Sequence, residues 1–280
     1  MIAAIWAGAF IGIKIAVPVV GPVGVAALRA AIGFAVLLPF GLLARMPPPG
    51  SYRDWAVLVA LAQLNITVPF FLISWAELTV DASVASLVMG IGPLFAMVGA
   101  HYFNDGDELS PIRIVGALVG LAGVAVLIGG EAIAGVGSSS FAAVGALITA
   151  SMCYVVSGLL VRRLDLPALP MSIYALGIAA ITLVPAFVAL TPTPPELDPR
   201  TLLAILYLGL IPTGLAYLLR FYLIRTVGYA TFAVSINLIP VFGVLFGVAI
   251  LGEALTPRIL VALAFVVCGL VLARKRGPVS

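Results

Sequence analysis

Charge-free apolar stretches recur along the sequence, and they constrain the fold more than any other feature. Residues 55–76, 82–100, 201–219 and 226–252 contain no Asp, Glu, Lys or Arg. Only 9% of the 280 residues are charged and 63% are hydrophobic, whereas soluble domains carry roughly 25% charged residues. A helix of roughly 20 apolar residues spans a bilayer core, whereas a membrane strand needs alternating polarity over about ten residues. The sequence therefore predicts an all-α integral membrane protein.

Clusters of Pro, Gly and charged residues separate the apolar stretches, because such residues end helices or prefer water. "RMPPPGSYRD", "TPTPPELDPR" and "GEALTPR" are examples. The apolar start is interpreted as a first span rather than a cleaved signal, because it lacks a basic region before it. Nine breaks predict ten transmembrane helices. Their predicted limits are 2–20, 23–45, 53–77, 81–103, 111–130, 141–163, 169–190, 200–225, 228–251 and 257–274.

Basic residues between the predicted helices indicate the orientation in the membrane. With both termini in the cytoplasm, the inner face carries Arg45, Arg53, Arg113, Arg162, Arg163, Arg225, Arg274, Lys275 and Arg276. The outer face then carries only Arg200 and Arg258. Basic residues gather on the cytoplasmic side of membrane proteins, so we expect cytoplasmic termini and a multi-pass protein of a bacterial-type inner (plasma) membrane. The net charge of +3 is then explained by topology and lipid headgroups rather than by nucleic acid.

Two segments far apart in the sequence resemble each other. "GIGPLFAMVGAHYFNDGDELSPIR" begins at Gly90, and "NLIPVFGVLFGVAILGEALTPR" begins at Asn237. Pro93 matches Pro240 at a shift of 147 residues. The duplication predicts two five-helix units, residues 1–135 and 136–280. Because five is odd, the second unit enters the membrane inverted, and such inverted repeats favour transport by alternating access.

The duplicated segments also predict local structure. Ser110-Pro111 and Thr256-Pro257 fit helix starts, where the hydroxyl caps free N–H groups and Pro occupies the first position. Asp107 and Glu253 precede these starts and suit the positive ends of the helices. Pro93 and Pro240 lie inside predicted spans, where each removes a backbone bond. We expect a kink or an unwound turn at each of these two prolines, and predict that both act as hinges beside a cavity.

The phrases "IWAGAFIGIK", "GPVGVAALRAAIGF" and "LGEALTPRILVALAFVVCGLVL", with the prolines of the fourth and ninth helices, resemble the drug/metabolite transporter superfamily. The similarity is to its EamA group of ten-helix exporters and covers essentially the whole chain. It implies inverted five-helix units around a central cavity lined by helices one to four and six to nine, with helices five and ten peripheral. It also implies export of amino acids and other small metabolites, as in YddG-type amino-acid exporters.

Three residues of the first span are candidates for the cavity wall. Trp6, Phe10 and Lys14 are four residues apart and share one helical face. The alternative is a lipid-facing aromatic stripe with a snorkelling lysine. Lys14 and Arg29 both lie inside predicted spans, where an unpaired charge is costly, so each should face a partner or water. Glu77 is the predicted counter-ion, and Arg29 either forms a structural ion pair or binds a substrate carboxylate.

Aromatic residues occur at equivalent places in the third and eighth spans. Phe70 and Trp75 correspond to Tyr217 and Tyr222 at the shift of 147. We predict that these four residues form an aromatic wall for an amphipathic substrate, and ordinary helix packing is the alternative. Asn237, three residues before Pro240, is predicted to offer a directional hydrogen bond to the substrate.

Other function classes have less support in the sequence. One histidine and two cysteines provide no metal-ligand spacing, so neither a metal nor a cofactor is predicted. An intramembrane enzyme would need a serine–histidine pair, a His-Glu-x-x-His motif or an aspartate cluster. Among carriers, a sugar-nucleotide or phosphate-ester transporter is the alternative, because Lys14 and Arg29 could bind anions. The predicted partners are a small-molecule substrate and membrane lipids.

Overall fold

The computed structural model describes residues 1–95, 110–133, 138–161, 163–191, 193–228, 232 and 236–273. Regular structure in this part of the chain is entirely helical, which confirms the predicted fold class. The α-helices are α1 (Ile2–Leu43), α2 (Tyr52–Ala62), α3 (Val68–Ala76), α4 (Ala82–Met89), α6 (Pro111–Ile133), α7 (Ser138–Val161), α8 (Ala168–Leu190), α9 (Pro199–Leu208), α10 (Ala216–Val227), α12 (Ile239–Phe246) and α13 (Pro257–Ala273). Three π-helical segments interrupt them: η1 (Gln63–Thr67), η2 (Gly209–Leu215) and η3 (Gly247–Leu251).

Helices long and apolar enough to cross a membrane account for much of the chain. Five of them lie in the described residues, spanning Ile2–Leu43, Tyr52–Ala76, Ser140–Val161, Ala168–Leu190 and Pro199–Val227. Shorter apolar helices cover Ala82–Phe95, Pro111–Leu127, Ile239–Leu251 and Pro257–Ala273. These limits follow the predicted spans closely, whereas the total of ten spans and the side of the termini stay predictions.

The first two predicted spans are the two arms of α1. They meet at Gly21, whose backbone (φ 70°, ψ 168°) is not helical. Only glycine adopts such a conformation without strain. A single residue therefore turns the chain between arms that both belong to the helical bundle.

The breaks at the two duplicated prolines differ from the prediction in detail. α4 ends at Met89, Gly90 and Ile91 form a turn, and helix resumes at Gly92. In the second half, residues 236–238 form a turn and α12 begins at Ile239. Pro93 and Pro240 thus lie in the first turn of a new helix, where the missing N–H has no intrahelical partner to lose. The expected interruptions are present, and their action as hinges stays a prediction.

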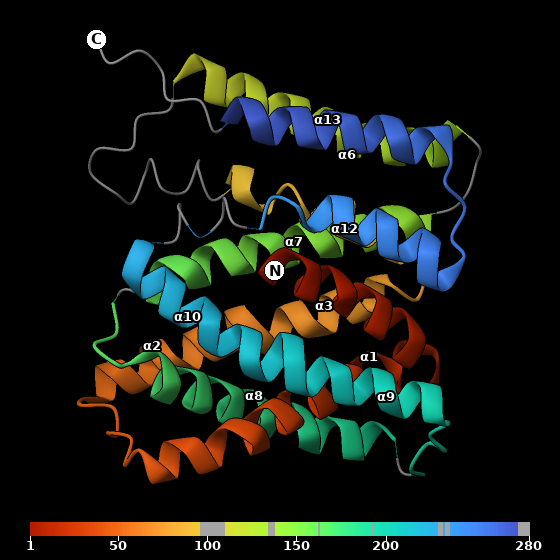
Figure 1. Ribbon diagram of the computed structural model, residues 1–280. Helices are drawn as coiled ribbons and strands as arrows, with labels where there is room; N and C mark the ends of the chain where they lie inside the picture. The colour runs from red at the N-terminus through yellow and green to blue at the C-terminus, as the bar shows by residue number, and fades with distance from the viewer. Residues whose placement is uncertain are drawn as a thin grey trace.

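α6 and α13 pack side by side at one edge of the bundle (Figure 1). Glycines make this contact close: a Cβ added at Gly116 would lie 2.7 Å from the Gly269 carbonyl oxygen. Small residues allow the same close approach in other membrane helix pairs. α4 packs against α12 in turn, and the arms of α1 contact α8 and α9.

The predicted helix caps are confirmed in part. Thr256 Oγ1 accepts a hydrogen bond from the Ile259 N–H at 3.3 Å, as expected for a cap of α13. Glu253 caps a different helix from the one predicted, because its carboxylate accepts hydrogen bonds from the N–H groups of Ala82 (2.7 Å) and Ser83 (3.0 Å) at the start of α4. Ser110 Oγ makes no hydrogen bond to the described residues, and Asp107 lies outside them.

Candidate functional site

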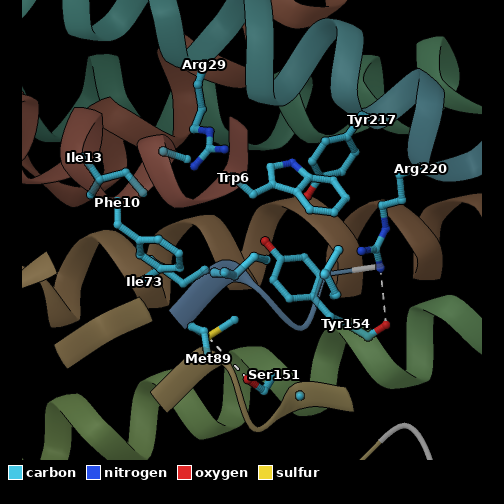
Figure 2. Close-up of a pocket in the computed structure, with 14 residues that line it drawn as sticks. Trp6, Phe10, Ile13, Arg29, Ile73, Met89, Ser151, Tyr154, Tyr217 and Arg220 are labelled. Carbon is cyan, nitrogen blue, oxygen red and sulfur yellow. Dashed lines mark hydrogen bonds between the residues drawn. The ribbon is translucent and has the colours of Figure 1, made fainter. Parts of the chain in front are cut away.

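A cavity of about 90 Å³ lies between α1, α3, α7 and α10 (Figure 2). Its walls are mainly apolar and aromatic, with two arginines. The lining residues are Trp6, Ala9, Phe10, Ile13, Arg29, Ile73, Met89, Gly92, Ser151, Tyr154, Tyr217, Arg220, Ile236 and Ile239. Of the predicted site residues, Trp6, Phe10, Arg29 and Tyr217 are therefore brought together around one space.

The indole of Trp6 and the phenol of Tyr217 are both held by π-helical backbone. Trp6 Nε1 donates to the Pro212 carbonyl oxygen in η2 at 3.1 Å. The Tyr217 hydroxyl donates to the Asn65 carbonyl oxygen in η1 at 2.8 Å. A π-helical turn interrupts the α-helical bonding pattern, which leaves such carbonyls available to side chains. Because these polar atoms are already used, both rings present mainly apolar surface to the cavity.

Arg29 is buried, and its orientation is fixed on two sides. Its Nε donates to Thr213 Oγ1 at 3.0 Å. Its Cζ lies 3.6 Å from the centre of the Phe70 ring, a cation–π geometry. The two Nη atoms make no hydrogen bond to the residues that the structure describes, and Figure 2 shows the guanidinium directed toward the cavity. Arg29 therefore retains donors for a ligand.

Arg220, on α10, was not predicted as a site residue. It is 4% exposed, and its Nη2 donates to the Tyr154 carbonyl oxygen at 3.5 Å. Its Cζ lies 5.2 Å from the Tyr154 ring centre, 5.3 Å from that of Phe232 and 5.9 Å from that of Trp6. The sequence did contain a signal, because a charge inside an apolar span usually serves function and residue 220 shares a helical face with Tyr217.

Three of the predicted aromatic wall residues do not line the cavity. Phe70 is fully buried and supports Arg29 instead. Trp75 is 37% exposed and Tyr222 is 56% exposed, so both lie on the outer surface of the bundle. The prediction that these three residues form the cavity wall is therefore wrong for this conformation.

Lys14 and Asn237 also lie outside the lining. Lys14 Nζ donates to the carbonyl oxygens of Glu77 (2.9 Å) and Val80 (2.7 Å) and lies 3.9 Å from Asp81 Oδ1. The predicted ion pair with the Glu77 carboxylate is wrong, because both carboxylate oxygens lack a hydrogen-bond partner among the described residues. Asn237 is half-buried in the turn before Pro240, next to the lining residue Ile236.

Comparisons with known proteins agree with this architecture. The model of the EamA-like transporter family matches residues 1–129 and 140–274. A probable terminal-alkyne amino-acid exporter of Streptantibioticus cattleyicolor is 24% identical over 97% of this chain and 90% of its own length. The uncharacterized transporter YdfC of Bacillus subtilis is 25% identical over 89% of this chain and 80% of its own length. A solved structure, described only as the crystal structure of a protein, shares the fold with a TM-score of 0.67 and 23% identity, covering 98% of this chain and 94% of its own.

The family match covers nearly the whole chain, and the apolar helices and central cavity fit a protein that moves a small molecule across a membrane. The chain belongs to the EamA-like transporter family and is an integral membrane transporter rather than an enzyme.

Proposed function

We propose that the protein exports amino acids or similar small amphipathic metabolites from the cytoplasm of a bacterial-type cell by alternating access. The observation that carries this proposal is the cavity between Trp6, Phe10, Tyr217 and the two arginines. Its aromatic walls suit the carbon body of such a substrate, and its guanidinium groups suit a carboxylate.

Internal symmetry supports the alternating-access part of the proposal. Phe70 and Tyr217, which are equivalent at the shift of 147, contact each other edge to face with ring centres 5.7 Å apart. Equivalent residues that touch are expected near a two-fold axis relating units 1–135 and 136–280. α6 and α13, which begin at the equivalent residues Pro111 and Pro257, also pack against each other. In inverted repeats, exchange of conformation between the units opens a central site to each side in turn.

Similarity to the probable terminal-alkyne amino-acid exporter of Streptantibioticus cattleyicolor supports the substrate class. The alternative, a sugar-nucleotide or phosphate-ester carrier, has one observation in its favour, namely the two guanidinium groups. Lys14, the other cation proposed for it, lies outside the cavity lining.

Counterflow in proteoliposomes tests the proposal. Purified protein is reconstituted, the vesicles are loaded with unlabelled candidates, and uptake of radiolabelled amino acids and nucleotide sugars is compared. We expect exchange of apolar amino acids and none of nucleotide sugars. Exchange of nucleotide sugars alone would contradict the proposal, and a Tyr217→Ala variant that still folds should show altered exchange kinetics.

A further inference from the structure

Resting on the proposed transport function, we propose that Arg29 and Arg220 make the cavity a site for organic carboxylates with an apolar or aromatic body. The carboxylate is the group that is recognised, and an ammonium group is dispensable. The substrate class thus extends from zwitterionic amino acids to acids of the same shape that carry a net negative charge.

Arg29 supplies a pre-organised anion-binding group. Its side chain is 4% exposed, and the bond to Thr213 and the ring of Phe70 fix the plane of the guanidinium. The Nη atoms that face the cavity hold four N–H donors. A guanidinium binds a carboxylate through two parallel hydrogen bonds, and here little side-chain entropy remains to be lost on binding.

Arg220 adds a second positive charge from another helix. Arg29 belongs to α1 and Arg220 to α10, so the two cations enter the cavity from different elements (Figure 2). The rings of Trp6, Tyr154 and Phe232 surround the Arg220 guanidinium at 5.2–5.9 Å. Two cations facing one apolar cavity attract an anion and repel a free ammonium group, and the low dielectric strengthens both effects.

The aromatic residues offer a binding surface for the carbon body of the carboxylate ligand. The polar atoms of Trp6 and Tyr217 are bonded to backbone carbonyls, so their rings offer flat apolar surface. Phe10, Ile13 and Ile73 extend this surface. A carboxylate held by arginine with a flat or branched carbon body against these rings satisfies both parts of the site.

Three probes of nearly equal size separate the recognised groups: 3-phenylpropionate has only the carboxylate, phenethylamine only the ammonium, and L-phenylalanine both. Binding is measured by quenching of Trp6 fluorescence in detergent. The chain has three tryptophans, so a Trp55→Phe/Trp75→Phe background leaves Trp6 as the only reporter. We expect 3-phenylpropionate to bind at least as tightly as L-phenylalanine, and phenethylamine to bind at least about tenfold more weakly.

Arginine variants in this background test the assignment of residues. Arg220→Gln should weaken 3-phenylpropionate binding at least about tenfold, because a charge-assisted hydrogen bond is lost, while phenethylamine binding stays unchanged or improves. Arg29→Lys keeps the charge but loses the planar fork, and should weaken carboxylate binding without unfolding the protein. Arg53→Gln, at an exposed site away from the cavity, is the matched control and should have no effect.

The outcomes separate this inference from the transport function on which it rests. L-phenylalanine that binds and exchanges while 3-phenylpropionate does neither would overturn the inference and leave amino-acid export standing. Carboxylate binding that is lost in Arg220→Gln, with no counterflow of any probe, would support the site and contradict the export function. Carboxylate binding that is equal in the parent, Arg220→Gln and Arg29→Lys would overturn the assignment of both arginines.

Discussion

Glu253 connects the segment before α13 to the start of α4 at one end of the bundle, and replacing it should allow that end to open. Glu253 lies in the non-helical segment between η3 and α13, yet its carboxylate accepts hydrogen bonds of 2.7 and 3.0 Å from the first N–H groups of α4. Ala82 and Ser83 are fully buried, so water cannot readily replace the lost acceptor. We predict that Glu253→Ala favours a conformation in which α4 and α12 separate at this end, which the predicted topology places outside the cell.

The size of the effect follows from the two bonds. Hydrogen bonds to charged groups contribute about 1.5–3 kcal/mol each. Glu253 is half-buried, which favours the lower value and gives about 3 kcal/mol for the pair. Since about 1.4 kcal/mol corresponds to a tenfold change in an equilibrium constant, the closed and open populations should shift by roughly 100-fold. Glu253→Gln, which keeps one neutral acceptor, should lie between the parent and Glu253→Ala.

Thiol reactivity in sealed cells measures this shift. A cysteine replaces the cavity residue Ile13 in a chain whose Cys153 and Cys268 are changed to serine, and a membrane-impermeant maleimide is added outside. The labelling rate should rise steeply in Glu253→Ala and remain unchanged in Glu196→Ala, an exposed acid far along the chain. Equal labelling rates in the parent and in Glu253→Ala, when thermal melting shows that both proteins are folded, would refute the prediction that Glu253 holds this end closed.

Three further predictions concern local stability and topology. Thr256→Ala removes the acceptor for the Ile259 N–H and should cost on the order of 1 kcal/mol in thermal unfolding; a changed substrate ranking at unchanged stability would instead place Thr256 in transport. A hydrogen bond from the Thr201 hydroxyl, assisted by backbone N–H groups, lowers the pKa of exposed Asp198. The ionised Asp198 carboxylate therefore stabilises the folded protein above the ordinary pKa of about 3.9, and this contribution is lost as the pH falls through the lower pKa of the folded state. Asp198→Asn should therefore reduce the acid-induced fall in melting temperature, and an unchanged profile would argue against this cap. Single cysteines in the loops of Asp107 and Glu253 should label from opposite sides of the membrane, and labelling of both from one side would rule out the inverted repeat.

The sequence predicted the helices well, because apolar length and the residues that end helices are local properties. Helical spacing identified Trp6 and Phe10, the cost of a buried charge identified Arg29, and equivalence to Phe70 identified Tyr217, and all four line one cavity. Lys14 follows Trp6 by eight residues, which turn the helix to about 80° from the direction of Trp6, whereas the lining residue Ile13, seven residues after Trp6, stays within about 20° of it. Lys14 therefore reaches the α3–α4 turn rather than the cavity.

The errors in the aromatic wall have a similar geometric cause. Trp75 and Tyr222 lie five residues after Phe70 and Tyr217, and five residues turn an α-helix by about 140° from its starting direction. Equivalence between the two halves therefore identified matching aromatic positions, but it did not show which of them lie on the helical face that points to the cavity. Arg220, three residues after Tyr217, lies on the face that the cavity uses. The contact between Phe70 and Arg29 depended on tertiary packing of α1 against α3, which no local pattern contains.

The geometry of the site depends on the number of residues in the π-helical segments. η1 and η2 occupy equivalent positions in the two halves, and each carries a carbonyl that anchors a ring of the cavity. Deleting one residue from Gln63–Thr67 would restore an α-helix, rotate everything after it by about 100° and carry Phe70 away from Arg29. A single-residue insertion or deletion in these segments would therefore rotate the side chains that follow it, while the hydropathy and the length of the span would hardly change. Both halves must keep their extra residue for Phe70 and Tyr217 to continue to meet.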